Sequence, residues 1–190
     1  MDDYKKIIAT IPDEKKADYI RNNWLSHDAR WQIEVVKNYG WEAGNKLNHT
    51  VAEDIGKVMM FRMMKSLGIK KVSNVNELIN ILLSVVKVSF PPPNSLYEIK
   101  IDSRSTLRLR CQKCPTHEKI VKAGATDFYD CGCFSLRKGF FNALNLTLEQ
   151  EKHACLIDGD EECNITLRIK EWENILDINP IKEKTQLLSD

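Results

Sequence analysis

All six cysteines of this chain lie in one stretch, from Cys111 to Cys163. None occurs in the first 110 residues or in the last 27. Clustering of this kind needs a local cause, and the candidates are a metal ion, an iron–sulfur cluster or disulfides. We therefore expect the rest of the chain to be organised around this stretch. The cysteines form three close pairs: Cys111 with Cys114, Cys131 with Cys133, and Cys155 with Cys163.

The compartment decides between these causes. The N-terminus, MDDYKKIIATIPDEKK, has no long apolar core and is not a signal peptide. The longest apolar stretch, residues 78–88, is interrupted by Asn80, Ser84 and Lys87 and is too short to span a bilayer. We therefore expect a cytoplasmic protein that does not associate with membranes. Thiols stay reduced in that compartment, which favours metal or redox chemistry over disulfides.

The charge balance bears on the partner. Lysine and arginine total 28 against 27 for aspartate and glutamate, a formal net charge of +1. A nucleic-acid-binding surface normally needs a clearly basic face, and the only basic run, Arg104 to Arg110, lies on a predicted strand. We expect no nucleic-acid partner. A small-molecule ligand is the expected partner, and a homodimer is a further hypothesis.

The first half of the chain has helical periodicity. Pro12 and Asp13 open one predicted helix that Gly40 closes, and a second helix follows over residues 42–67. Asn74 is a good N-cap for a third helix that begins at Val75. The run Phe-Pro-Pro-Pro at 90–93 then ends the helical region.

The second half changes to strand periodicity. Alternating residues predict strands over 96–101 and 106–109, and two more over 147–157 and 163–169, with helices over 114–123 and 133–144 between the two pairs. The predicted fold class is α+β: an N-terminal helical unit packed on a small antiparallel sheet with two crossing helices. The predicted domains are a helical unit at 1–90, a cysteine-rich α+β domain at 95–170 and a C-terminal tail at 171–190.

The first long helix carries polar residues on its apolar stripe. His27 and Asp28 lie three and four residues after Trp24, on the stripe that continues to Trp31. A buried carboxylate costs free energy unless it is paired. The pair is therefore an internal His–Asp contact, an ion pair to a neighbouring helix, or the polar anchor of a ligand pocket. The hypothetical pocket is lined by Trp24, Trp31, Phe134 and Phe141, with His27 and Asp28 as anchors.

The cysteine spacings predict a metal site. Zinc takes four thiolate or imidazole ligands in a tetrahedral arrangement, and the two residues between Cys111 and Cys114 let both sulfurs face one ion. Zinc is the predicted cofactor, an iron–sulfur cluster is the alternative, and six buried thiols without metal remain a third interpretation. His153 lies two residues before Cys155, so in a strand both point to the same face. The candidate ligands are Cys111, Cys131, Cys133, Cys155, Cys163 and His153.

The end of the cysteine-rich region resembles the 4-vinyl reductase-like domain. The residues that carry the resemblance are Gly-Phe-Phe-Asn-Ala-Leu at 139–144, an alternating strand, and a hairpin from Cys155 to Cys163 that contains Gly159–Asp160. The resemblance implies a small-molecule sensor in which the two hairpin cysteines help to hold zinc. It also implies a third cysteine upstream, matched here by Cys131 or Cys133. Where that family has an acidic ligand, this sequence has Lys152, between Glu151 and His153.

The N-terminal half is similar to an uncharacterised family of cytosolic proteins, mostly from anaerobes. The matching residues are Trp-Leu-Ser-His-Asp-Ala-Arg-Trp at 24–31 and Gly-Trp-Glu-Ala-Gly at 40–44, followed by Cys111, Gly124 and Cys131. Related sequences are often labelled as hydrolases of a small thiazoline amino acid.

Three functions are therefore open. The first is a zinc-containing small-molecule-binding protein. The second is a metal-dependent hydrolase of a small amide-like or thiazoline substrate, in which an open zinc position activates water. The third is an interaction or dimerisation module, which an exposed apolar face on the first helices would support. No catalytic residue is assigned, because the sequence has no nucleophile elbow, phosphate loop or His-Glu-X-X-His pattern.

Overall fold

The computed structural model describes residues 3–170 and 185–187 of the 190-residue chain. The chain is α+β, as predicted, and it divides into two compact units, Met1–Gly44 and Asn45–Asp190. Apart from 185–187, the predicted C-terminal tail lies outside the described residues. No helix within the described ranges is long and apolar enough to cross a membrane.

The first unit is helical. It contains α1 (Asp3–Ala9) and the first part of α2 (Asp13–Leu67). At Gly40 the backbone of α2 leaves the helical conformation, with φ of 81° and ψ of 170°. A positive φ is readily adopted only by glycine, which explains why the first predicted helix ends where the sequence placed its end.

The second unit begins within α2 and continues with α3 (Val75–Ser89). The Asn74 side chain accepts a 2.8 Å hydrogen bond from the backbone N–H of Glu77, so the predicted N-cap is confirmed. The remaining helices of this unit are α4 (Pro115–Lys122), α5 (Cys133–Ala143) and the short 3-10 helix η1 (Leu156–Asp158).

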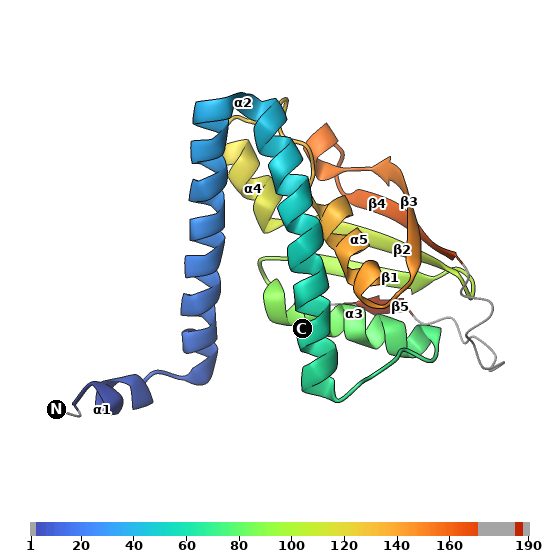
Figure 1. Ribbon diagram of the computed structural model, residues 1–190, viewed down its shortest axis with the longest axis horizontal. Helices are drawn as coiled ribbons and strands as arrows, with labels where there is room; N and C mark the ends of the chain where they lie inside the picture. Colours follow the sequence, from blue (N-terminus) through green and yellow to red (C-terminus); the bar gives the residue numbers. More distant parts are fainter. Residues whose placement is uncertain (1–2, 171–184, 188–190) are drawn as a thin grey trace. The chain divides into compact units, whose positions relative to one another are not determined.

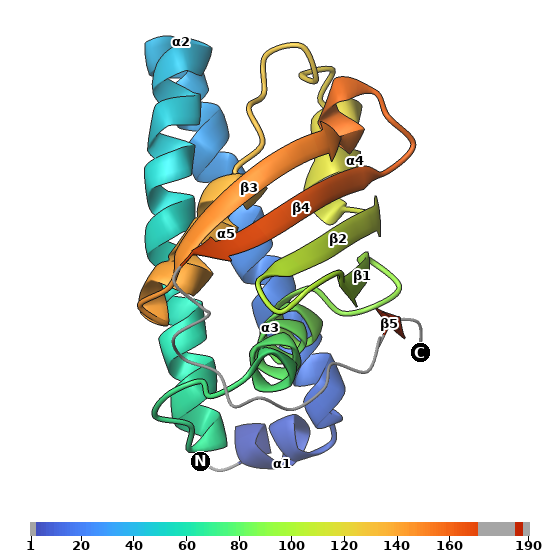
Figure 2. The same cartoon turned by 90° about the vertical axis from the view of Figure 1, so that its right-hand side faces the viewer.

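The sheet of the second unit is antiparallel, in the order β3-β4-β2-β1-β5 (Figure 2). Two pairings join sequence neighbours, β1 with β2 and β3 with β4, and two join strands that are distant in sequence, β2 with β4 and β1 with β5. The register places Cys111 on β2 directly opposite Cys163 on β4. The bounds are β1 (Leu96–Ile101), β2 (Thr106–Lys113), β3 (Thr147–Ala154), β4 (Cys163–Lys170) and β5 (Thr185–Leu187).

One face of this sheet is covered and the other meets solvent. Helices α3 and α5 lie on the same face (Figure 1), and side chains alternate between buried and exposed along β2. The exposed face carries ion pairs such as Arg110 with Glu162 at 2.8 Å. The core includes Met60 of α2, Leu78 of α3 and Phe141 of α5, each with an exposed fraction of zero.

This shared core explains where the units divide. The domain boundary expected near residues 90–95 stays a prediction; the chain divides into its two compact units between Gly44 and Asn45, inside α2. The second part of α2 and all of α3 pack in one core with the strands, so they belong to the same unit as the sheet. The proline-rich turn at 90–93 joins two elements of that unit.

Helices α2 and α5 cross very closely in the second unit. A Cβ atom added at Gly139 would lie 2.1 Å from the carbonyl oxygen of Glu53, and one at Gly56 would lie 2.3 Å from the carbonyl oxygen of Leu136. Only glycine permits this backbone approach. The crossing fixes α5, whose N-terminal half carries residues of the site described next.

Candidate functional site: a ring of thiols

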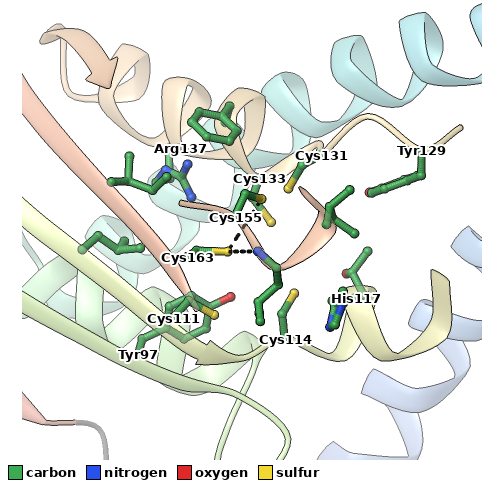
Figure 3. Close-up of a pocket in the computed structure, with 16 residues that line it drawn as sticks. Tyr97, Cys111, Cys114, His117, Tyr129, Cys131, Cys133, Arg137, Cys155 and Cys163 are labelled. Carbon is green, nitrogen blue, oxygen red and sulfur yellow. Dashed lines mark hydrogen bonds between the residues drawn. The ribbon is translucent and has the colours of Figure 1, made fainter. Parts of the chain in front are cut away.

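All six cysteines line one cavity of the second unit (Figure 3). Its volume is about 30 Å³, room for about two water molecules. The wall comes from the ends of β2 and β4, the starts of α4, α5 and η1, and the loop before α5. Apart from the cysteines, the cavity is lined by Tyr97, Leu109, Thr116, His117, Tyr129, Phe134, Arg137, Leu156, Ile157 and Ile165.

The six thiols form a ring in which the pKa of each depends on two neighbouring thiols. The Sγ atoms of Cys155 and Cys163 lie 3.8 Å apart. The three cysteine pairs seen in the sequence are therefore neighbours of one another around the cavity, although they lie on different helices and strands. The order around the ring is Cys111, Cys114, Cys133, Cys131, Cys155, Cys163 and back to Cys111.

Cys114 is one of two thiols that favour the thiolate. Its pKa lies well below the usual range, first because the thiols of Cys111 and Cys133 donate hydrogen bonds to its sulfur. The backbone N–H groups of His117 and Thr116 act in the same direction. Cys114 is the N-cap of α4, where unpaired N–H groups stabilise a negative charge.

Cys155 is the second such thiol. Hydrogen bonds from Cys131 and Cys163 lower its pKa, with smaller contributions from the N–H of Ile157 and the charge of Lys152. Cys155 is the N-cap of η1, so its position resembles that of Cys114. The two thiols whose pKa is lowered therefore lie on opposite sides of the ring, each between two thiols whose pKa is raised.

In the other four cysteines the pKa is raised, which favours the protonated thiol. The pKa of Cys133 lies well above the usual range, first because of hydrogen bonds with Cys114 and Cys131 and then because of burial. The pKa values of Cys111, Cys131 and Cys163 are also raised. These thiols are the donors that stabilise the two thiolates.

Arg137 contributes a positive charge to the cavity wall. Its Nε donates a 2.7 Å hydrogen bond to Oε1 of Gln150, and its guanidinium lies 4.6 Å from the centre of the Phe134 ring. Its Nη2 is buried and has no hydrogen-bond partner among the described residues. A buried hydrogen-bond donor without an acceptor destabilises the folded state, so this nitrogen is a candidate contact for a ligand.

The loop before α5 is tied to α2. Asn45 donates from Nδ2 to the carbonyl oxygen of Phe128 at 2.8 Å and accepts from the N–H of Asp130 at 3.2 Å. One turn later, His49 lies 2.9 Å from the Ser135 hydroxyl through Nδ1 and 2.9 Å from the Asp130 carboxylate through Nε2. The second contact lies outside the hydrogen-bonding direction, because Nε2 has no hydrogen-bond partner. These contacts hold the loop that carries Cys131 against the cavity.

The predicted metal cofactor is not supported. Among the residues that the structure describes, no group of three or more His, Cys, Asp or Glu side chains is arranged to hold a metal ion. Tetrahedral zinc requires four ligands at about 2.3 Å from one ion, whereas the thiols here follow one another around a cavity wall. The predictions of zinc, and of an iron–sulfur cluster as its alternative, are therefore corrected.

Some of the predicted site residues line the cavity and others lie elsewhere in the structure. The five cysteines proposed as ligands all line the cavity, whereas His153 points to Thr166, with Nε2 at 2.8 Å from Oγ1. Phe134 lines the cavity, but Phe141 is fully buried in the core. The four residues of the predicted polar anchor belong to the first unit and do not line the cavity; they are Trp24, His27, Asp28 and Trp31.

The first helix also differs from the expectation of a buried stripe. Trp24 is 37% exposed and Trp31 47% exposed, and both His27 and Asp28 are exposed. The sequence pattern identified the stripe, but it does not specify what packs against it.

Sequence reasoning missed several cavity residues. Cys114 was not chosen as a ligand, although its spacing from Cys111 and its position before Pro115 placed it at the start of a helix. Arg137 had no sequence signal of its own. Its role follows only from the packing of α5 against β3, through Gln150.

Comparisons with known proteins establish the fold and little more. No family model matches the chain, and no curated protein matches it. A solved structure, a trafficking protein particle complex subunit 3 from Naegleria fowleri covalently bound to palmitic acid, is similar with a TM-score of 0.55 and 15% identity. The match covers 83% of this chain and 97% of that one. At this identity the likeness supports the α+β architecture alone.

Proposed function

We propose that this chain is a small-molecule-binding protein that captures a small thiol-reactive ligand by a covalent bond to a cysteine of the ring. One observation carries the proposal: six cysteines, each from a different element or loop, line one cavity of the second unit. The thiolate is the nucleophilic form of cysteine, and the helix starts at Cys114 and Cys155 supply the N–H groups that stabilise it.

The size of the cavity limits the ligand. A volume of about 30 Å³ accepts a group of a few non-hydrogen atoms. The similar Naegleria fowleri structure also has a covalent ligand, palmitic acid, but a sixteen-carbon chain is too large for this cavity. The proposed ligand is therefore a small electrophile. The hydrolase alternative depended on a metal-bound water and is not proposed.

Alkylation of the native protein tests this function. Iodoacetamide transfers a carbamidomethyl group to a thiolate, with loss of iodide, and the modified residues can be mapped by mass spectrometry. We expect the first group on Cys114 or Cys155, at a rate at pH 6 that exceeds the rate for the unfolded chain. The double variant Cys114→Ala, Cys155→Ala should lose this fast phase.

Three outcomes would contradict the proposal. One is native thiols that react more slowly at pH 6 than those of the unfolded chain. A second is fast reaction confined to cysteines other than these two. The third is stoichiometric zinc or iron in the isolated protein, because the thiols would then be ligands and not free nucleophiles.

The first unit supports a second candidate, a homodimerisation module. Its helices expose large apolar side chains, with Ile20 68%, Trp31 47% and Ile8 49% exposed. Ile20 and Trp31 share one helical stripe, and a second copy of the chain would bury both. Light scattering should then give twice the mass of one chain, and Ile20→Lys should halve it. A monomer at all concentrations would exclude this function.

A further inference from the structure

We infer that the ligand of the thiol ring carries a negative charge and that Arg137 binds it. This inference rests on the proposed function, since it specifies the chemical class of the same ligand. Arg137 lines the cavity (Figure 3), and its Nη2 is buried and has no hydrogen-bond partner among the described residues. A guanidinium nitrogen in that situation is matched by an anionic acceptor such as a carboxylate.

The rest of the guanidinium is already fixed. Its Nε donates to Gln150, and Gln150 donates in turn from Nε2 to the carbonyl oxygen of Phe134 at 2.7 Å. The Phe134 ring stacks on the guanidinium. The side chain is therefore held in place before a ligand arrives.

A matched pair of reagents measures this effect. Iodoacetate and iodoacetamide share the reacting carbon and the leaving iodide, and they differ only in that one carries a carboxylate and the other an amide. The rate ratio of iodoacetate to iodoacetamide is measured for the native protein and again for the same protein unfolded in denaturant. The unfolded ratio removes the intrinsic difference between the reagents.

We expect the native ratio to exceed the unfolded ratio by about tenfold, the lower end of what one hydrogen bond to a charged group contributes. Arg137→Gln should bring the ratio of the two rates down to that of the unfolded chain. Arg137→Lys keeps the charge and should keep part of the preference. The wild-type ratio by itself decides the question if a variant fails to fold.

The failures are distinguishable. If iodoacetamide modifies the ring rapidly but the native and unfolded ratios agree, the charge inference is wrong and the proposed function stands. If neither reagent reacts faster than with the unfolded chain, both are wrong. A preference that survives in Arg137→Gln also overturns the role of Arg137.

Discussion

The crossing of α2 and α5 at Gly56 and Gly139 makes a quantitative prediction. In Gly139→Ala the new Cβ would lie 2.1 Å from the Glu53 carbonyl oxygen, whereas ordinary van der Waals contact begins at 3.4 Å. The obstacle is backbone, so the helices must move apart by about 1.3 Å to relieve the overlap. Gly56 lies under the same crossing, because its Cα would be 3.0 Å from the added atom.

The expected cost follows from two opposing terms. Overpacking costs about 3 kcal/mol at the upper end of its usual range, which a backbone obstacle warrants. Alanine favours the helix over glycine by about 1 kcal/mol. The net loss is about 2 kcal/mol, or about 4–8 °C in melting temperature for a unit of this size.

Thermal unfolding followed by circular dichroism measures the effect. The control is Thr50→Ala on α2, the other helix of the crossing, where the side chain is exposed and the smaller residue meets no obstacle. We expect the control to melt within about 2 °C of wild type. A Gly139→Ala variant at least as stable as wild type would show that the helices do not approach this closely.

Three further predictions concern the cavity and the segments around it. The pKa of Cys133 is raised from an ordinary value of 9.0, so its buried thiol stabilises the folded state below that pH, and this stability is lost as the pH rises above it. The melting temperature of the wild type should therefore fall above pH 9, and that of Cys133→Ala should fall less. Asn45→Ala removes both bonds to the loop before α5, so backbone amides at 126–130 should exchange about tenfold faster or more in hydrogen-exchange mass spectrometry, and unchanged exchange would refute the tether. Asp160→Ala leaves the N–H of Cys155 without its 2.7 Å acceptor and should cost about 1–3 kcal/mol in chemical denaturation; a loss below about 0.5 kcal/mol would show that water replaces the carboxylate.

Local rules predicted most of the elements. The end of the first long helix at Gly40, the cap at Asn74 and the start of a helix at Pro115 depend on backbone preferences of single residues, which a sequence displays directly. The strand pairs followed from alternation in the same way. Helix and strand ends differ from the predictions by a few residues, as between the predicted end of β2 at residue 109 and its observed end at Lys113.

The site could be predicted only in part. The clustering of the cysteines in the sequence identified the residues of the site. Their order around the ring could not be predicted, because it depends on which helices and strands pack together in the tertiary structure. Cys114 hydrogen-bonds with Cys133, nineteen positions away, because α4 and α5 both begin at the cavity. The apolar stripe with Trp24 and Trp31 predicted burial that the structure does not show, since periodicity identifies a face without identifying a partner.

A crystal structure of the protein after reaction with iodoacetate would test the central proposal most directly. We expect a carboxymethyl group on Cys114 or Cys155, with its carboxylate within hydrogen-bonding distance of Nη2 of Arg137. The remaining thiols should keep their order around the cavity. An unmodified ring, an adduct whose carboxylate points away from Arg137, or sulfurs that surround a metal ion would contradict the proposal.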